Sequence, residues 1–508
     1  MSRPRAVVVG SGIGGLAAAL RLAARGYAVR VLEALDRPGG RARVFRQDGF
    51  VFDAGPTVIT APVLFDELFA RTGARREAYV EFVPVDPYYR VVFHDGATFD
   101  YVGDEERLLA QIRAFEPRDV DGYRRLVALV RRIYRAGYLG LGDRPFLRKR
   151  DMLPILPAMV RLRSYRSVYG LVRQYLRDER LRRLFSFESL LIGGHPFRVP
   201  SLYLLIHWLE RAGGVWFARG GTGALVAAMV RRLEELGGEL VLEAPVDAFE
   251  FGSRTIRAAV TADGRRWPAD LVVANADPLF VYRHLVPPER RPGTPDRRLR
   301  RVRTSMGLFV LYFGTRRLDV ELAHHTVWLG PRYRGLLDDL VVRHRLPPDD
   351  LSVYLHAPTR TDASLAPAGH DGFYVLAPVP NLRAGIDWAC AAAPLAERLY
   401  DQLERTLLPG LRAARVTQRW LTPADFAAEL RSVDGAAFGP EPLLRQSAAF
   451  RFPNRCPDIS NLFFVGAGTH PGAGLPGVVL SARVLDRLLG PVPGLPPLVP
   501  LARLGPPA

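Results

Sequence analysis

The chain opens with RAVVVGSGIGGL, residues 5–16, in which an apolar run is followed by four glycines within six residues. The apolar run predicts a buried parallel strand, and the alanine- and leucine-rich segment after it predicts a helix that reaches about Arg25. Gly26 ends that helix, and YAVRVLE, residues 27–33, predicts a second strand that closes on Glu33. Strand, glycine-rich turn, helix and second strand together indicate a βαβ unit.

The glycine spacing within this unit, GxGxxG, is typical of a dinucleotide-binding turn. Gly10 permits the tight turn, Gly12 lets a pyrophosphate approach the backbone, and Gly14 and Gly15 open the helix, where Gly15 allows close packing on the strand. The helix N-terminus carries partial positive charge for the phosphates. Glu33 can accept hydrogen bonds from the ribose hydroxyls of an adenosine. We therefore predict a bound dinucleotide; the alternative is an empty structural turn.

A second glycine-rich stretch, VGAGTHPGAGLPG, lies at residues 465–477, after the apolar run 462–464. Pro476 stands near the start of a predicted helix that reaches about Leu489, and Gly490 follows it, as is usual at the two ends of a helix. We interpret the two distant turns as holding two ends of one long cofactor.

Composition limits the class of protein. A chain of 508 residues predicts two domains. The formal charge of +18, in which Lys149 is the single lysine, favours an anionic surface, a membrane or nucleic acid. No recognised nucleic-acid-binding module accompanies the arginines, so nucleic acid is not predicted as a partner. Cys390 and Cys456 form no CxxC pair, which excludes a disulfide framework and a thiolate metal site and favours a reducing compartment.

Residues 148–183 combine eleven basic and three acidic side chains with many apolar ones. This pattern predicts peripheral docking on anionic lipid; the alternative is a solvated pair of arginine-rich helices. The sequence contains no run of about 18 uncharged apolar residues, so no membrane-spanning helix is predicted. The spaced glycines in residues 6–24 argue against a signal peptide. We expect a cytoplasmic protein that lies on the inner face of the cell membrane.

Two short motifs follow the βαβ unit. Gly39-Gly40-Arg41 offers backbone amides and a guanidinium to a pyrophosphate or a flavin edge. The alternative is that Arg41 is an ordinary surface residue. Asp53-Ala54-Gly55-Pro56 predicts a tight loop. The order of Glu33, GGR and DxG resembles the flavin amine oxidase and carotenoid desaturase superfamily, in which the dinucleotide is FAD.

That resemblance extends to the returning half of the nucleotide-binding domain. It implies that the backbone of Val246 meets the adenine and that the turn Asn275-Ala276-Asp277-Pro278 closes the sheet near the nucleotide. A plain strand residue is the alternative for Val246.

Over residues 5–490 the chain is similar to the bacterial-type phytoene desaturases. The resemblance rests on VVVGSGIGGL, GGRA, FDAGPTVIT, GVWFARGGTGALV, LAHHTV, VYLHAP, YVLAPVPNL and NLFFVGAGTHPGAGLPGVVLS. It implies FAD-dependent desaturation of 15-cis- or all-trans-phytoene, a lipophilic C40 polyene, to neurosporene or lycopene. Quinone or oxygen is the implied electron acceptor. His195 and Glu188 depart from the residues usual in that family, Asn and His, and bear on substrate preference.

The resemblance also implies a fold class, α/β, with a Rossmann-like FAD-binding domain of the amine-oxidase type. We expect this domain to comprise residues 1–75, 206–300 and 441–490. An interleaved α+β substrate domain with a helical, membrane-contacting region takes residues 76–205 and 301–440. The proline-rich tail, residues 491–508, cannot pack as regular structure; it either helps membrane contact or is disordered.

Desaturation of this kind needs a hydride acceptor, which is flavin N5, and loss of a proton from the neighbouring carbon. The amides of Gly477 and Val478 are predicted to face the flavin pyrimidine edge and to stabilise negative charge there. Gly466 and Gly468 are predicted to lie beside the ribityl chain and the phosphates of the cofactor. Asp151, beside Arg150, is our candidate for proton transfer, with a surface salt bridge as the alternative.

Other readings stay open at this stage. A hydroxycarotenoid 3,4-desaturase, a C30 squalene or diapophytoene desaturase, an amine oxidase and a prenyl-group carrier of the GDP-dissociation-inhibitor type share the fold. No catalytic metal motif occurs, and adjacent His324 and His325 are expected to face opposite ways in a strand, so no metal is predicted. The oligomeric state is not predicted.

Overall fold

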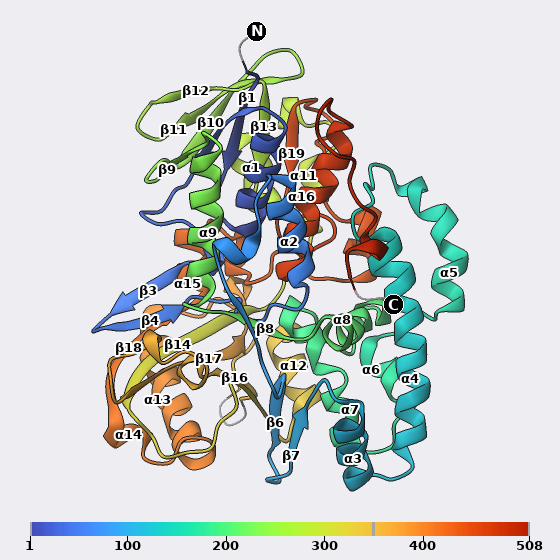
Figure 1. Cartoon of the computed structure of the whole chain (residues 1–508), viewed down its shortest axis with the longest axis vertical. Coiled ribbons are helices and arrows are strands. Elements are labelled where there is room, and N and C mark those ends of the chain that lie inside the picture. The colour runs from blue at the N-terminus through green and yellow to red at the C-terminus, as the bar shows by residue number, and fades with distance from the viewer. Residues whose placement is uncertain (1–2, 348–350, 506–508) are drawn as a thin grey trace.

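The computed structural model describes residues 3–347 and 351–505, and their two largest sheets lie toward opposite ends of the long axis (Figure 1). The first sheet is parallel, with strand order β19-β13-β1-β2-β9. Its strands are β1 (Arg5–Val9), β2 (Ala28–Leu32), β9 (Glu239–Val241), β13 (Leu271–Ala274) and β19 (Leu462–Phe464). Thus β1 and β2 with α1 (Ile13–Ala24) between them confirm the predicted βαβ unit.

Alternating side chains of the first sheet face two different layers, as period-2 strands require. Ala6 and Val8 of β1 pack among helices, whereas Val7 and Val9 pack against a three-stranded antiparallel sheet. The helices are α1, α2 (Pro62–Arg71), α9 (Thr222–Glu235) and α16 (Leu475–Leu489). The small sheet consists of β10 (Val246–Phe251), β11 (Ile256–Thr261) and β12 (Arg266–Pro268).

The second sheet has the order β18-β14-β17-β16-β15-β6-β7 and comes from the middle of the chain. Its strands are β6 (Tyr89–Phe93), β7 (Thr98–Tyr101), β14 (Gly307–Arg316), β15 (His325–Leu329), β16 (Val353–His356), β17 (His370–Val379) and β18 (Arg415–Leu421). One face packs against α13 (Trp388–Thr406) and α14 (Leu411–Ala414). The strands of the first sheet lie within residues 5–32, 239–274 and 462–464, and those of the second within residues 89–101 and 307–421.

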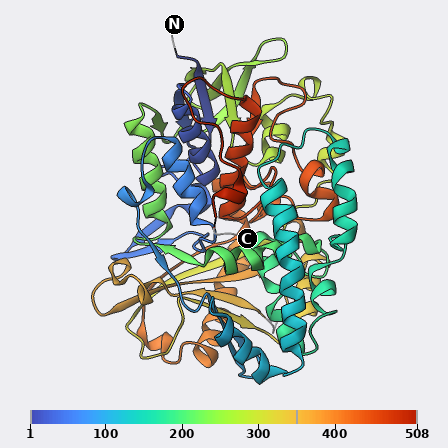
Figure 2. The same cartoon turned by 45° about the vertical axis from the view of Figure 1, so that its right-hand side comes forward.

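Helices of residues 105–213, with one later helix beside them, lie along one side of the molecule, next to the second sheet, and come forward in Figure 2. They are α3 (Glu105–Phe115), α4 (Asp119–Tyr134), α5 (Leu156–Arg161), α6 (Val168–Val172), α7 (Glu179–Leu184), α8 (Leu205–Gly213) and α12 (Tyr333–Val341). Shorter pieces elsewhere are β3 (Val44–Gln47), β4 (Phe50–Asp53), β5 (Phe82–Pro84), β8 (Trp216–Ala218), α10 (Pro278–Phe280), α11 (Asp296–Leu299) and α15 (Pro423–Leu430). No helix of the described residues is both long and apolar enough to cross a bilayer.

The proline-rich tail differs from the prediction. Residues 491–505 pack back on the nucleotide-binding domain, and a short 3₁₀ turn buries Leu501 in the helical core layer. Arg71 donates a hydrogen bond to the carbonyl of Pro496 at 2.5 Å, and Arg483 donates to that of Val499. Residues 491–505 are ordered because arginines satisfy the carbonyls of a segment that makes few backbone hydrogen bonds of its own. Residues 506–508 lie outside the described residues, and membrane contact of the tail stays a prediction.

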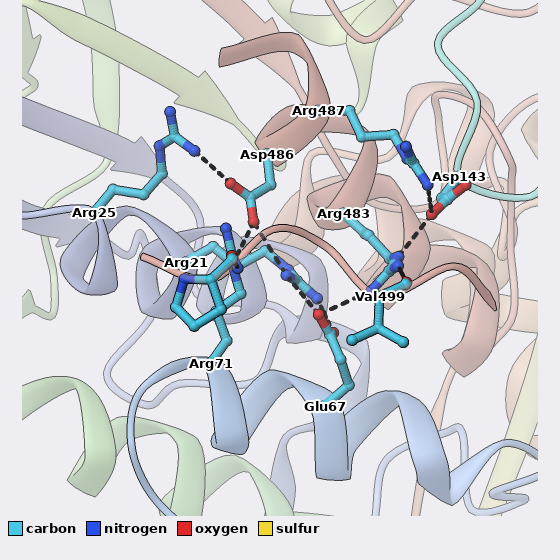
Figure 3. Close-up of polar contacts among 10 residues, drawn as sticks. Arg21, Arg25, Glu67, Arg71, Asp143, Arg483, Asp486, Arg487 and Val499 are labelled. Carbon is cyan, nitrogen blue, oxygen red and sulfur yellow. Dashed lines mark hydrogen bonds and ion pairs between the residues drawn. The ribbon is translucent and has the colours of Figure 1, made fainter. Parts of the chain in front are cut away.

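Those arginines belong to a buried ionic network between α1, α2 and α16 (Figure 3). Asp486 of α16 accepts hydrogen bonds from Arg25 at 2.6 Å and from Arg21 at 3.3 Å, and it forms an ion pair with Arg71 at 2.7 Å. A second group joins Arg483 to Asp143 at 2.7 Å and to Glu67 at 2.8 Å. The network holds the helix that follows the second glycine-rich turn against the helix that follows the first.

Candidate functional site

A cavity of about 500 Å³ lies between the two sheets and continues from the first glycine-rich turn to the inner face of the second sheet. Its far part is lined mainly by aliphatic side chains from β14, β15, β17, α8 and α12. Examples are Leu308, Val327, Leu376, Leu209 and Leu336. The cavity thus combines a glycine-lined end with an apolar chamber.

The glycine-lined end is built around the side chain of Asn275. A Cβ at Gly12 would lie 2.7 Å from Asn275 Nδ2, and one at Gly14 would lie 2.7 Å from Asn275 Oδ1. Gly466, with φ +89°, packs against the same amide from the other glycine-rich stretch. Gly10 has φ +94°, a conformation that side chains of L-residues rarely adopt. The fold therefore brings the two turns, some 450 residues apart, into direct contact.

Not every predicted glycine reaches the cavity. A Cβ at Gly15 would lie 2.1 Å from the carbonyl oxygen of Gly10, so this glycine serves close packing of helix on strand, as the motif requires. Gly468 packs against Pro278 and is absent from the lining. The other predicted cofactor residues line the cavity: Gly10, Gly12, Gly14, Glu33, Gly40, Arg41, Gly55, Pro56, Val246, Asn275, Gly466, Gly477 and Val478.

Glu33 stands at the end of β2 with its carboxylate fixed by the turn that it faces. It accepts hydrogen bonds from Ser11 N at 2.8 Å, Ser11 Oγ at 2.5 Å and Leu35 N at 3.0 Å. The carboxylate is buried at the cavity wall. This is the position from which an acidic residue meets a ribose hydroxyl.

Arg41 is partly buried and lines the cavity. Its Nε donates to the carbonyl of Ala437 at 2.7 Å and its NH2 donates to Ser432 Oγ at 3.1 Å. Burial lowers the pKa of its guanidinium from the ordinary value. The side chain therefore links the GGR turn to residues 432–437 and presents positive charge beside the glycine cradle.

The start of α16 matches the predicted helix, with one correction. The helix runs from Leu475 to Leu489, and Gly490 follows with φ +75°. The amide of Val478 donates to the carbonyl of Gly474 at 3.0 Å, so the prediction of a free amide at Val478 is wrong. The helix begins one residue earlier than expected, which makes Val478 the first residue inside the hydrogen-bonded ladder and leaves the amide of Gly477 in the unpaired first turn.

Asp151 and Arg150 do not line the cavity. The Asp151 carboxylate accepts hydrogen bonds from the backbone amides of Leu147 at 3.0 Å and Arg148 at 2.9 Å. The amide of Arg148 is the largest cause that holds the pKa of Asp151 below its usual value. The geometry is that of a cap on a short 3₁₀ helix, and the catalytic role stays a prediction that this geometry does not favour.

A pair of carboxyl groups that the sequence reasoning did not select lies at the apolar chamber. Glu210 of α8 lines the cavity and is fully buried, and Tyr89 donates to its Oε1 at 2.8 Å. Glu188 interacts with Glu210 and also lies 2.9 Å from His207 Nδ1. Burial raises the pKa of Glu188 to about 8 and raises that of Glu210 well above its usual value.

Burial also lowers the pKa of His207 to about 3, so this ring stays neutral. At neutral pH, therefore, the two carboxyl groups hold at least one proton between them. A signal for this pair exists in the sequence, because Glu188 and Glu210 stand in the apolar segments FSFESLLI and YLLIHWLE. Their proximity depends on the packing of α8 against residues 187–192, which the sequence does not reveal.

The two adjacent histidines also differ from the prediction. His324 precedes β15, so strand alternation does not apply to it, and its ring centroid lies 4.4 Å from that of His325. His356 at the end of β16 completes a buried group of three.

Comparisons with known proteins agree with this geometry. Residues 13–484 match the family model described as flavin containing amine oxidoreductase. The chain is 50% identical over 483 residues to a lycopene-forming phytoene desaturase of Pantoea ananas, covering 95% of this chain and 98% of the relative. It is 40% identical to a neurosporene-forming phytoene desaturase of Rhodobacter capsulatus, covering 96% and 94%.

Solved structures are similar in fold at much lower identity. An oxidoreductase from Methanosarcina mazei aligns with a TM-score of 0.63 and 18% identity over 95% of this chain and 100% of that one. Cyclohexylamine oxidase from Brevibacterium oxydans aligns with a TM-score of 0.60 and 17% identity over 96% and 98%.

Proposed function

Because the chain belongs to the flavin-containing amine oxidoreductases and, among them, to the phytoene desaturases, we propose that it desaturates phytoene to lycopene or neurosporene. It is an FAD-dependent oxidoreductase. The observation that carries the substrate assignment is the apolar chamber that continues from the glycine cradle. A chamber of aliphatic side chains suits a hydrocarbon polyene and offers little to a charged amine.

The cradle fits FAD. Gly10, Gly12 and Gly14 line the cavity, where a pyrophosphate would meet their backbone, and the α1 N-terminus supplies partial positive charge. Glu33 is placed for the ribose, while Arg41 and the amide of Gly477 supply positive charge along the rest of the cavity wall. FAD, when bound, supplies the oxidant that accepts a hydride from the substrate.

Forming one carbon–carbon double bond removes a hydride from one carbon and a proton from its neighbour. The hydride leaves with its electron pair to the oxidant, and quinone or oxygen then takes the two electrons onward. The proton needs an acceptor at the chamber. Glu210, backed by Glu188, is the carboxyl group that the geometry favours for this role, because it lines the chamber and Asp151 does not. Since its pKa is raised, it accepts the proton only in its ionised fraction, which grows as the pH rises.

Membrane contact is part of the same proposal, with the protein on the inner, cytoplasmic face of the cell membrane. Large apolar side chains are exposed over residues 147–165: Leu147, Leu153, Leu156, Val160 and Tyr165. Basic side chains surround them, which suits an anionic lipid surface. Phe146, which lines the cavity, packs with Met152 and Ile155 beneath this surface. A lipid-soluble substrate would therefore meet the chamber close to the membrane.

Product analysis tests the proposed function. The chain is expressed in cells that accumulate phytoene and lack any desaturase, and the pigments are identified by absorption spectrum and mass. We expect coloured C40 carotenes with lycopene or neurosporene as the end product. Unchanged phytoene, with pigment formed only when a C30 precursor or a hydroxycarotenoid is supplied, would assign the chain to another desaturase class.

A further inference from the structure

Three buried histidines meet beside the substrate chamber. His325 opens β15 and pairs in register with His356, the last residue of β16. His324 directly precedes the strand. The ring centroids lie 4.4 Å apart for His324 and His325, 4.8 Å for His324 and His356, and 5.4 Å for His325 and His356. Antiparallel pairing and the one residue before it therefore bring three imidazoles together.

All three rings are withdrawn from water, with exposed fractions of 5% for His324 and 0% for His325 and His356. Removal from water favours the neutral form of an imidazole. Each keeps one lone pair on a ring nitrogen, which is the form of histidine that binds metal ions.

Hydrogen bonds orient two of the rings by their Nδ1 atoms. His324 Nδ1 lies 2.6 Å from Thr361 Oγ1, and His325 Nδ1 lies 2.7 Å from the hydroxyl of Tyr354. Their Nε2 atoms point elsewhere: His324 Nε2 lies 3.0 Å from His356 Nε2. Oxygen partners on the second nitrogen are the usual outer contacts of metal-binding histidines.

Two ring nitrogens remain unexplained by hydrogen bonding. His325 Nε2 and His356 Nδ1 are buried and have no hydrogen-bond partner among residues 3–347 and 351–505. If the three rings were only hydrogen-bonded to one another, the Nε2 atom of His325 would stay buried without a partner, which costs the free energy of its lost hydration. A cation shared by the three Nε2 atoms would use it.

We propose that His324, His325 and His356 bind one transition-metal ion of the zinc class through their Nε2 atoms. Zinc–nitrogen distances of about 2.0–2.1 Å in a tetrahedron require nitrogens about 3.3 Å apart. One ligand atom of each histidine already lies within 4.8 Å of the others, and one pair lies at 3.0 Å. Small side-chain rotations complete the site. The fourth position takes a water, whose pKa zinc lowers to about 7, so that hydroxide offsets part of the buried charge.

The ion would have a structural role near the substrate. Tyr354, which binds His325, lines the chamber and also lies 3.2 Å from Thr57 Oγ1. Fixing His325 would fix this part of the chamber wall. The proposal does not depend on which polyene the chamber accepts.

Metal content tests the proposal directly. The full chain is purified with its FAD, stripped with a chelator, incubated with ZnCl₂ or CoCl₂ and passed over a desalting column. We expect about one ion per chain and a visible cobalt spectrum typical of tetrahedral nitrogen ligation. Both are expected to be lost in His356→Ala and in the closer-sized His356→Gln, with FAD content unchanged.

His94→Ala and His284→Ala, which remove exposed histidines, control for binding at the surface. Retention of the ion by both His356 variants, or an ion content in the wild type no greater than that of an unrelated protein treated alike, would overturn the proposal. If His356→Ala misfolds, the wild-type stoichiometry and the His356→Gln result still decide it.

Discussion

Gly12 shows how little room one residue leaves in the cradle. A Cβ there would lie 2.7 Å from the Asn275 amide, closer than side-chain carbons approach such a group. We predict that Gly12→Val abolishes FAD binding, so that the purified variant is colourless. Gly140→Val, at an exposed glycine whose added Cβ meets no atom closer than 3.5 Å, is the control and should be yellow. A yellow Gly12→Val protein would refute the cradle.

Glu210 is the residue on which the proton-transfer step depends. We predict that Glu210→Gln lowers turnover by about 100-fold or more while FAD content stays normal, because general bases contribute roughly 10²–10⁴. Steady-state pigment formation by purified protein in phytoene-loaded liposomes measures this. Asp151→Asn is the comparison, and a large loss there beside normal turnover of Glu210→Gln would return the role to Asp151.

Whether a site residue could be predicted from the sequence depends on how local the sequence pattern is that identifies it. The glycines of both turns and Glu33 are recognisable because one short motif fixes their spacing and conformation. Glu188, Glu210 and the three histidines meet through packing of separate segments, so no local pattern pairs them. The prediction for the Val478 amide was wrong because the helix starts one residue earlier than expected. Sequence patterns place such boundaries only approximately.

At the scale of elements, α1, α2 and α16 are joined by buried charges in addition to apolar packing (Figure 3). Asp486 faces three arginines, and its side chain is 1% exposed. Removing one charge from such a group leaves its partners buried and uncompensated.

We therefore predict that Asp486→Asn lowers the free energy of unfolding by about 3 kcal/mol. Chemical denaturation followed by circular dichroism measures the change. Asp401→Asn, which breaks an exposed pair with Arg412, is the matched control and should have no measurable effect. Equal effects of the two substitutions would show that the network contributes no more than surface pairs do.

The elements were predicted better than their contacts. The βαβ unit and α16 appear where apolar runs and helix-end residues predicted them. The packing of residues 491–505 was not predicted from the sequence. Their proline content indicates few backbone hydrogen bonds, but it does not reveal the arginines that bind the free carbonyls.

For the whole molecule, the exposed apolar surface over residues 147–165 next to the chamber is the feature that supports the proposed membrane contact. We predict that the double variant Leu153→Glu/Val160→Glu keeps its FAD but loses binding to vesicles of anionic lipid. Co-sedimentation with vesicles measures this, and an equally acidic pair of changes at exposed residues of α13 and β18, Ala393→Glu/Val416→Glu, is the control. Unchanged sedimentation of the first variant would place the membrane contact elsewhere.

The central claim is that one cavity holds FAD at its glycine-lined end and phytoene in its apolar chamber. The most direct measurement is a single turnover without oxygen or quinone, in which FAD-loaded protein is mixed with phytoene in liposomes. The account predicts loss of the oxidised flavin absorption, with one new double bond in the polyene for each flavin reduced. A flavin spectrum that stays oxidised while phytoene is present in excess would contradict it.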